Sequence, residues 1–341
     1  MRPVVRPIAA GDLPALIELA RGAGIGVTTL PPDEARLARR IEISCEAFAG
    51  RLEPARASYL FVLEDPAGGR VAGTSGIAAA VGLDEPWYNY RVGTLVTSSR
   101  EIGVHRQMQT LFLTNDLTGA TELCSLFLHP GSRRGAHGAL LSKARFLYLA
   151  EFPERFTEKV IAELRGVADA EGRSPFWDSL GRHFFDMEFS RADYLSGVGN
   201  KVFIAELMPQ HPVYTSLLSE AARAAIGEVH EHTRPARALL EAEGFSYQGY
   251  VDIFDAGPAL ACARAAIRAV RESRVCEAAA GGPGAGPLHL VSNRDERAFR
   301  VLLAPGAVGA EGGFALAEAD LEALGVAAGA SVRVVPVQPA R

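Results

Sequence analysis

The chain has 341 residues, 48% of them hydrophobic and 22% charged, a balance typical of a folded protein with a buried core. A length of roughly 150 residues per domain predicts two or three folded units. The net charge of −5 and the sequence pI of about 6.0 exclude, for the chain as a whole, the basic surface that a nucleic-acid partner requires.

The chain shows no membrane or metal signal. No apolar run approaches the roughly 20 residues of a membrane span, and residues 1–12 lack the layout of a signal peptide. We therefore expect a cytoplasmic protein without a membrane partner. Its four cysteines are scattered and have no histidine at ligand spacing, which predicts reduced, packed thiols and no metal: Cys45, Cys124, Cys262 and Cys276.

The first third of the chain predicts the order β-α-α-β-β. Residues 4–8 have the pattern of a short strand, and Asp12 is placed to cap a helix with apolar positions at helical spacing. A second helix is predicted over residues 32–49. Residues 59–63 and 71–81 flank a turn sequence and predict a β-hairpin.

The middle of the chain centres on an apolar strand. Residues 86–118 are aromatic and polar, with strands loosely expected at 90–97 and 108–114. Residues 122–128 form a nearly unbroken apolar run, which indicates a central strand covered on both faces. A basic, glycine-rich turn follows, and a helix is predicted over 139–152.

The last part predicts a second unit after a linker. A strand is expected at 159–167, and helix-turn-strand units at 175–189 and 235–254. The Gly/Pro/Ala segment 279–286 has the composition of a linker, which divides a body at 1–278 from a small β-rich appendage at 287–341. That appendage is expected to contain strands at 288–291, at 299–303 and near the end of the chain, and a helix at 317–324.

The turn after the apolar strand suits an anion. A strand followed by small residues and a helix directs backbone N–H groups and a positive dipole toward a phosphate, so residues 133–138 are a candidate pyrophosphate cradle. Glycine-rich turns also join strands to helices in proteins that bind nothing, and this alternative stays open. A Walker A motif is excluded because no Gly-Lys-Ser/Thr follows, and the spacing of Gly135 and Gly138 disfavours a dinucleotide fingerprint.

The order of elements resembles the GNAT acyltransferase superfamily. Its donor-binding pattern is Arg/Gln-x-x-Gly-x-Gly/Ala, and this chain has Arg133-x-x-Ala136-x-Gly138, so Ala136 replaces the first glycine. The resemblance implies an α+β fold, with a mixed sheet flanked by helices. Gly135, next to Ala136, offers the backbone freedom that the substitution removes.

Longer motifs resemble the arginine N-succinyltransferase family of bacterial arginine catabolism. They run from about residue 4 to residue 275 and include residues 86–95, 122–128, 174–177, 189–193, 203–209, 211–214 and 236–254. The family is similar to GNAT enzymes with an added C-terminal barrel-like domain, which fits the predicted appendage. Some of its members occur as paired, related subunits, so a homo-oligomer or a hetero-oligomer with a related subunit is expected.

The resemblance implies succinyl transfer from succinyl-CoA, as co-substrate, to the α-amino group of arginine, with ornithine as a further acceptor. Leu126 resembles the succinyl-CoA contact and His230 the catalytic proton donor. Histidine titrates near neutrality and suits proton transfer, but His232 in the same polar loop would suit it as well; only the resemblance selects His230. The residues predicted to bind the acyl donor are Leu126, Phe127, Leu128, Arg133, Arg134, Gly135, Ala136 and Gly138.

Residue chemistry leaves the other contacts open. The candidate phosphate cations are Arg133, Arg134, Lys143 and Arg145, each of which could instead be a solvated helix-face charge. A carboxylate is the natural partner of a guanidinium, and five are eligible: Asp186, Glu188, Asp193, Glu206 and Asp252. Arg91 or Arg191 is expected at the succinyl carboxylate, so the predicted substrate-binding residues are Arg91, Arg191, Asp193 and Glu206. An aromatic group, Trp87, Tyr88 and Tyr90, is either pocket wall or core.

Two alternatives remain at this level. One is an N-acyltransferase with another acyl donor or amine acceptor. The other is a non-catalytic or regulatory CoA-binding subunit paired with a catalytic paralogue, although the presence of His230 and Leu126 disfavours it.

Overall fold

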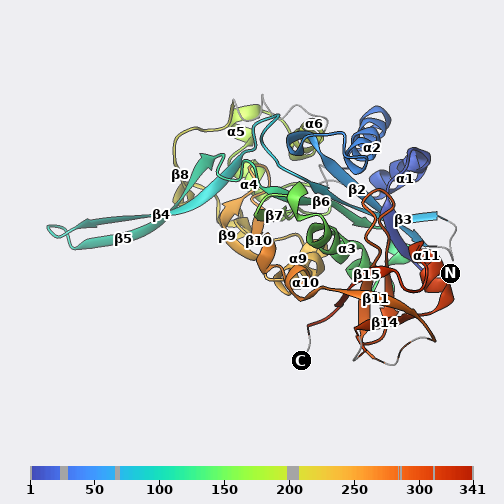
Figure 1. Cartoon of the computed structure of the whole chain (residues 1–341). Coiled ribbons are helices and arrows are strands. Elements are labelled where there is room, and N and C mark those ends of the chain that lie inside the picture. Colours follow the sequence, from blue (N-terminus) through green and yellow to red (C-terminus); the bar gives the residue numbers. More distant parts are fainter. Residues whose placement is uncertain are drawn as a thin grey trace.

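The chain forms one continuous mixed sheet with helices on both faces (Figure 1). The structure is a computed structural model that describes residues 2–23, 30–65, 70–197, 207–282, 284, 286–309 and 312–339. The predicted fold class, an α+β protein with a mixed sheet flanked by helices, is confirmed. No helix within these ranges is long and apolar enough to cross a membrane.

The sheet contains fifteen strands among the described residues, in the spatial order β14-β11-β15-β12-β13-β1-β2-β3-β6-β7-β10-β9-β4-β5-β8. Most neighbours are antiparallel, and β6 and β7 form a parallel pair near the centre. The strands are β1 Val4–Pro7, β2 Ser58–Asp65, β3 Arg70–Ala78, β4 Asn89–Ser99, β5 Val104–Thr114, β6 Thr121–Leu128, β7 Lys159–Glu163, β8 Val213–Tyr214, β9 Ser246–Val251, β10 Pro258–Ala263, β11 Arg274–Ala280, β12 Leu288–Ser292, β13 Val301–Pro305, β14 Gly313–Leu316 and β15 Ser331–Pro336.

Helices cover both faces of the sheet centre, which explains why β2 is apolar on both sides. Tyr59 and Phe61 pack in one core cluster with Tyr148 of α3, whereas Leu60 and Val62 pack in another with α1 and α2. Alternate strand residues face opposite sides, so a strand covered twice needs a continuous apolar run. The helices are α1 Leu13–Ala23, α2 Glu34–Phe48, α3 His137–Glu151, α4 Pro175–Ser179, α5 Arg182–Phe185, α6 Phe189–Gly197, α8 Glu220–Ala225, α9 Arg234–Glu241, α10 Arg268–Glu272 and α11 Glu318–Leu324.

Most predicted elements occur within a few residues of their expected bounds, and two do not. The helix-turn-strand unit predicted at 175–189 is wrong, because α4 and α5 occupy this segment, α6 begins at its last residue and no strand lies there. These helices bury Phe176, Trp177 and Phe185 in a separate core, so their apolar residues serve helix packing. The strand expected over 159–167 ends at Glu163, where β7 leaves the sheet.

The C-terminal strands are joined to the body through β1. This strand pairs with β2 on one side and, at Val5 and Val301, with β13 on the other. β11 begins at Arg274 and pairs with β14 and β15, so the strands of the C-terminal part start ahead of the predicted linker at 279–286. The division into 1–278, 279–286 and 287–341, and the barrel-like form of the appendage, stay predictions.

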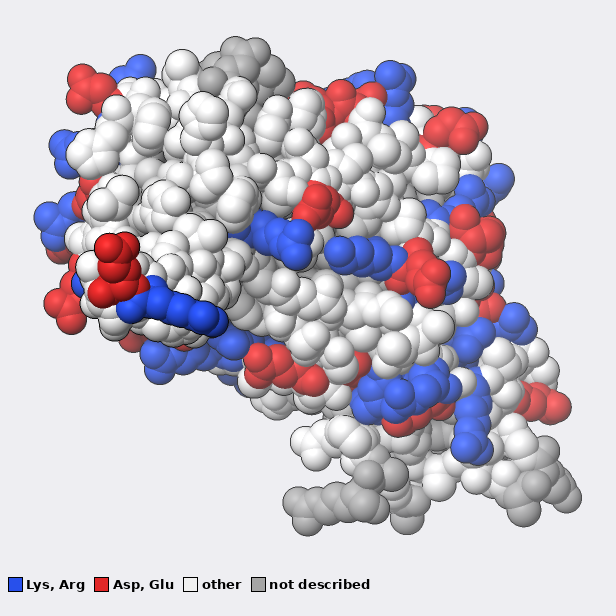
Figure 2. Space-filling model, turned by 90° about the vertical axis from the view of Figure 1, so that its left-hand side faces the viewer, with Lys and Arg blue, Asp and Glu red and all other residues white. Residues whose placement is uncertain are grey.

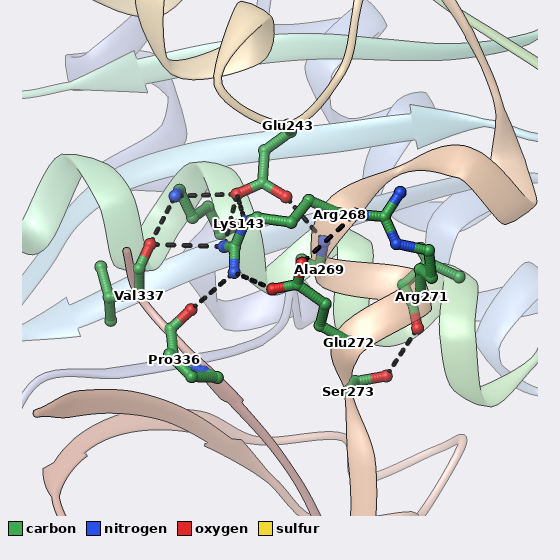
Figure 3. Close-up of polar contacts among 10 residues, drawn as sticks. Lys143, Glu243, Arg268, Ala269, Arg271, Glu272, Ser273, Pro336 and Val337 are labelled. Carbon is green, nitrogen blue, oxygen red and sulfur yellow. Dashed lines mark hydrogen bonds and ion pairs between the residues drawn. The ribbon is translucent and has the colours of Figure 1, made fainter. Parts of the chain in front are cut away.

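A buried ion network ties the end of the chain to α3 and α10 (Figure 3). Glu243 is fully buried, and its Oε1 lies 2.8 Å from Nζ of Lys143 and 2.7 Å from Nη2 of Arg268. Lys143 also donates to the carbonyl of Val337 at 2.6 Å, and Arg268 to that of Pro336 at 3.1 Å. The last described residues are therefore held by buried charges of the body.

Candidate functional site

A cavity opens where β6 and β7 separate. The two strands pair only at Thr121 with Val160 and at Glu122 with Ile161. Beyond these pairs they diverge, and residues 122–126 form one wall of the cavity while residues 162–165 form the other. Ser125 has a φ of +53°, and the register of β6 with β3 shifts beside it, so an irregularity bends β6 at the opening.

Charged groups gather in this cavity. Its described lining residues include four carboxylates and two guanidinium groups: Glu122, Glu163, Asp252, Asp255, Arg145 and Arg165. Glu163 accepts hydrogen bonds from Nε1 of Trp87 at 3.1 Å and from Nδ2 of Asn89 at 2.7 Å, which fixes its carboxylate. Asp255 accepts from the N–H groups of Gly166 and Gly257. Within the described part of the chain, carboxylates outnumber guanidinium groups in this lining, which suits a cationic ligand.

A second, smaller cavity adjoins the first. It is lined by residues 86–88, 163 and 252–254, and it shares Trp87, Glu163, Asp252 and Phe254 with the larger one. The two cavities therefore meet at a pair of carboxylates and an indole ring. Trp87 and Tyr88 are pocket wall, whereas Tyr90 is buried in the core with Phe176, so the aromatic group serves both purposes.

The turn after β6 has the form predicted for a phosphate cradle. A short 3₁₀ helix, Pro130–Ser132, leads to Gly135 at a φ of +52°, and α3 begins at His137. The cap position, Ala136, makes no side-chain hydrogen bond to the helix, and a Cβ at Gly138 would meet no atom within 4 Å. The exposed turn therefore gives an anion close access to the start of a helix of fifteen residues.

The two arginines of the turn differ in their partners. Arg134 forms a 2.7 Å ion pair with the buried carboxylate of Asp65. Arg133 is exposed, and its Nε donates to the carbonyl of Leu128 while its guanidinium lies 6.0 Å from the Phe127 ring. Because Asp65 already offsets the charge of Arg134, Arg133 is the stronger candidate for a phosphate.

This difference makes a prediction for two matched variants. Arg133→Ala is expected to raise KM for the acyl donor about tenfold, the cost of one charge-assisted hydrogen bond, and to leave KM for the acceptor unchanged. Arg134→Ala should raise it less. Initial rates at varied donor concentration test this, and a larger effect of Arg134→Ala would reverse the assignment.

Lys143 and Arg145 do not belong to the cradle. Both are buried in α3, so neither prediction for them holds: they are not exposed phosphate contacts, and they are not solvated charges on a helix face. Lys143 pairs with Glu243. Arg145 lies eight residues after the start of α3, about 12 Å along the helix at 1.5 Å per residue. Its guanidinium bonds to Ser142 and to the carbonyls of Gly76 and Cys124, and burial lowers its pKa to about 10.

His230 lies beside the cavity. Its N–H donates to the carbonyl of Arg165 at 2.9 Å, and both Arg165 and Thr233 line the cavity, although His230 is not among the described lining residues. Its Nδ1 accepts from the N–H of His232 at 3.2 Å, which leaves the proton of the neutral ring on Nε2. Partial burial, then the charge of Arg165, lowers the pKa of His230 below its ordinary value of 6.5. The ring is therefore largely neutral at pH 7.

The structure places the predicted donor residues around the opening of the strands. Leu126 lines the cavity, Phe127 is buried against α1 and α2, and Leu128 packs at the edge of the core formed with α3. Of the donor-binding residues on β6, only Leu126 thus faces the cavity. Their roles stay predictions.

The four predicted substrate-binding residues lie away from the cavity or outside the described part of the chain. Arg91 is exposed on β4 opposite Phe112, and Arg191 is exposed on α6, two residues after the cavity residue Phe189. Neither is among the described lining residues. The side chain of Asp193 and the whole of Glu206 fall outside the described part of the chain. Of the five eligible carboxylates, Asp252 lines the cavity.

Sequence reasoning missed four charged residues of the site: Glu122, Glu163, Arg165 and Asp255. Glu122 begins the apolar run of β6, Glu163 ends β7, and Arg165 follows two residues later. A charged residue within a run that is otherwise covered on both faces is a usable signal, because burying it unpaired is costly. The sequence pattern alone assigns Glu122, Glu163 and Arg165 to strands, without a role in a site.

The comparisons with known proteins agree along the whole chain. A family model described as the arginine N-succinyltransferase beta subunit matches residues 3–269, and one for the C-terminal domain of that subunit matches residues 271–336. The chain is 58% identical over 336 residues to the arginine N-succinyltransferase subunit beta of Pseudomonas aeruginosa, with 98% of both chains covered. It is 52% identical over 334 residues to the arginine N-succinyltransferase of Salmonella newport, with 97% of both covered.

A solved structure extends this likeness to three dimensions. The arginine/ornithine succinyltransferase subunit AI of Pseudomonas aeruginosa superposes with a TM-score of 0.92 at 37% identity, covering 99% of each chain. Family models, relatives and fold agree from residue 3 to residue 336. The chain therefore belongs to the arginine N-succinyltransferase beta-subunit family.

Proposed function

We propose that this protein transfers the succinyl group of succinyl-CoA to the α-amino group of arginine. The observation that carries the proposal is the cavity between β6 and β7, with His230 beside it and with Glu163 and Asp252, which we call the acidic wall, among its lining residues. The exposed turn at residues 133–138 follows β6 along the chain, just before α3. The names of the related proteins support both substrates. A cytoplasmic location and work within an oligomer, which the relatives' designation as subunits supports, are part of the same proposal.

The donor would lie along the opening of β6. Beyond Glu122 the edge of β6 toward β7 has no ladder partner in β7, so it can bind the amide groups of the pantetheine arm as an added strand would. The diphosphate would then rest on the turn at residues 133–138, and the thioester would reach the cavity near Leu126. This places the acyl carbon between the two diverging strands.

The reaction would join the acyl carbon to the amine nitrogen and release CoA. Neutral His230 would take a proton from the attacking amine as the C–N bond forms. When the tetrahedral intermediate collapses, the C–S bond breaks and the protonated ring would give its proton to the leaving thiolate. The lowered pKa of His230 favours the neutral ring, which is the form that the first of these proton transfers requires.

The acidic wall would select the acceptor. Glu163 and Asp252 lie where the two cavities meet, beside the indole of Trp87. A guanidinium pairs well with carboxylates and with an aromatic face, so this end suits the side chain of arginine. The same chemistry admits ornithine, whose ammonium carries the same charge.

Direct turnover tests the proposal. The purified chain should release CoA from succinyl-CoA in the presence of arginine, with ornithine slower or equal, and the product should gain the mass of one succinyl group. Lysine and glutamate serve as longer and anionic controls, and acetyl-CoA as a donor control. Preference for acetyl-CoA or for glutamate would refute the assigned donor or acceptor, and no turnover with any pair would refute the activity.

The acidic wall makes a second, separate prediction. Glu163→Gln and Asp252→Asn should each raise KM for arginine about 10- to 100-fold, from the loss of about 1.5–3 kcal/mol for a hydrogen bond to a charged group. KM for the acyl donor should stay within twofold. Both changes retain an oxygen acceptor, which matters because Oδ1 of Asp252 accepts from the N–H groups of Phe254 and Asp255.

An acid outside the cavity is the control for this pair. Glu228→Gln removes an exposed carboxylate that is not among the described cavity residues, and KM for arginine should not change. If all three variants raised KM for arginine equally, the cause would be the overall electrostatic field of the protein and not direct contacts of arginine with Glu163 and Asp252.

A further inference from the structure

The hairpin of β4 and β5 extends away from the body of the protein as an arm (Figure 1). The two strands pair with each other from Asn89 and Thr114 to Ser99 and Val104. Among the described residues, they pair with the rest of the sheet at the base alone, where β4 pairs with β9 at Tyr90 and Arg91, and β5 pairs with β8 at Thr110 and Leu111. An isolated two-stranded hairpin is at best marginally stable in water, so the arm calls for a further contact.

The two faces of the arm differ in polarity. Leu95 lies opposite Met108, and Arg91 opposite Phe112, on the face that the odd-numbered residues of β4 share. Leu95 is 38% exposed and Phe112 44% exposed. The other face carries Thr94 opposite Gln109 and Val96 opposite Gln107, and Val96, its one large apolar residue there, is 54% exposed. Nearer the base, the apolar residues of this face enter the core. The first face therefore carries three large apolar side chains, Leu95, Met108 and Phe112, together with Arg91 and Arg106, and we call it the Leu95 face.

The outer edge of β4 lacks protection against strand pairing. Residues 92–99 read Val-Gly-Thr-Leu-Val-Thr-Ser-Ser, without charge or proline. The outer edge of β5 contains His105 and Arg106. Exposed edges in soluble proteins are usually interrupted by charges or proline, so the plain edge of β4 suits contact with another chain. Ile102, at the tip, is 72% exposed.

Charge favours a second copy of the chain as the partner. Three arginines and one glutamate give residues 89–114 a formal charge of +2, whereas the whole chain carries −5, so the remainder carries −7. A basic arm and an acidic body attract one another when two copies exchange arms. Figure 2 views the molecule from the side toward which the arm projects in Figure 1, and the face it shows is mostly uncharged, with basic and acidic side chains in small separate groups. Such a face suits a protein partner better than a polyanion.

We propose that the β4–β5 arm packs, through its Leu95 face, on the body of a second copy of this chain, and that the two copies exchange arms about a two-fold axis. A reciprocal exchange closes the assembly at two chains and buries both arms. The proposal does not depend on the identity of the substrate.

The mass of the protein in solution tests it, with two matched pairs of substitutions. The wild-type chain at about 50 µM, above the µM range of weak interfaces, should have twice the 36.3 kDa mass of one chain by light scattering. Leu95→Glu with Met108→Glu should give the single-chain mass. Val96→Glu with Gln107→Glu places the same charges on adjacent residues of the opposite face, and this control should keep the double mass.

Each contrary outcome overturns the proposal. A monomeric wild-type chain excludes a second copy as the partner, including the case in which only a different protein binds the arm. A double mass in the Leu95→Glu, Met108→Glu chain, or a single mass in the control, excludes the Leu95 face. Circular dichroism and the thermal midpoint, which should match the wild type, separate dissociation from unfolding.

Amide exchange locates the contact independently. In the wild-type protein the backbone amides of residues 92–99 should exchange at least tenfold more slowly than in the Leu95→Glu, Met108→Glu chain, because the arm is covered only in the double-mass species. Equal exchange rates in the two proteins would place the interface elsewhere and overturn the assignment to the arm.

Discussion

Exchange of His230 for Asn is expected to lower kcat by about 10²-fold or more, the usual cost of losing a general acid or base. Asparagine keeps a side-chain acceptor for the N–H of His232, which His230 provides through Nδ1, so the 3₁₀ turn at 231–233 should persist. KM for both substrates should change little. Steady-state rates at saturating donor and acceptor measure the effect.

His232 provides the control for this experiment. Its ring centroid lies 5.0 Å from that of His230, and its side chain is 74% exposed. His232→Asn removes an imidazole from the same loop, and kcat should stay within about twofold because a solvated ring outside the cavity contributes little. If His232→Asn were the damaging change, or if His230→Asn kept full activity, His230 would have no place in the mechanism.

The pH profile gives the same residue a second signature. Burial and Arg165 lower the pKa of His230 below 6.5, so the neutral, proton-accepting form persists to lower pH than for a free histidine. The acid limb of kcat/KM should therefore fall below pH 6.5, since the rate drops only as the ring gains its proton. The His230→Asn chain should lack this limb, and a limb that survives the substitution belongs to another group.

Exchange of Glu243 for Ala is expected to lower the free energy of unfolding by about 3–5 kcal/mol, the cost of breaking a buried ion pair from one side. Lys143 and Arg268 both lie against this carboxylate, and Glu243 also accepts from the N–H of Ala269 at 2.8 Å (Figure 3). Its removal leaves two buried cations facing one another. The midpoint of urea unfolding measures the loss.

Glu272 is the control within the same network. It pairs with Arg268 at 3.2 Å but is 38% exposed, so solvent screens the pair and Glu272→Ala should cost at most about 1 kcal/mol. Similar midpoints for the two variants would show that burial does not strengthen the Glu243 contacts. If the Glu243→Ala chain does not fold, the loss of stability is at least as large as expected. The loss is then measured on Glu243→Gln, which keeps the volume of the side chain.

The sequence predicts the centre of the fold because local pattern and tertiary environment agree there. The continuous apolar residues of β2 and β6 are covered on both faces, and the basic turn before α3 is exposed, as its composition indicates. Length, periodicity and turn chemistry decide such elements. The family resemblance, based on long motifs, then extends this prediction to the activity.

Prediction is poorer where the environment of a residue is set by distant parts of the chain. In the sequence, Lys143 and Arg145 look like cations on a helix surface. In the structure, however, Lys143 donates to the carbonyl of Val337 near the C-terminus, and Arg145 donates to the carbonyl of Cys124 at the bend in β6. Glu163 and Asp252 are 89 positions apart and meet only because β7, β10 and β9 are adjacent. No local sequence pattern predicts that two such distant residues lie close together.

The position of β1 has a consequence for synthesis on the ribosome. This strand is made first, yet its second neighbour, β13, is made near the end, and Arg2 donates to Leu303 across a separation of 301 positions. At 5–20 residues per second, β1 emerges about 15–60 s before β13. During that interval the nascent chain carries an open strand edge, so molecular chaperones that shield such edges should raise the yield of native protein, and chains truncated before β13 should aggregate.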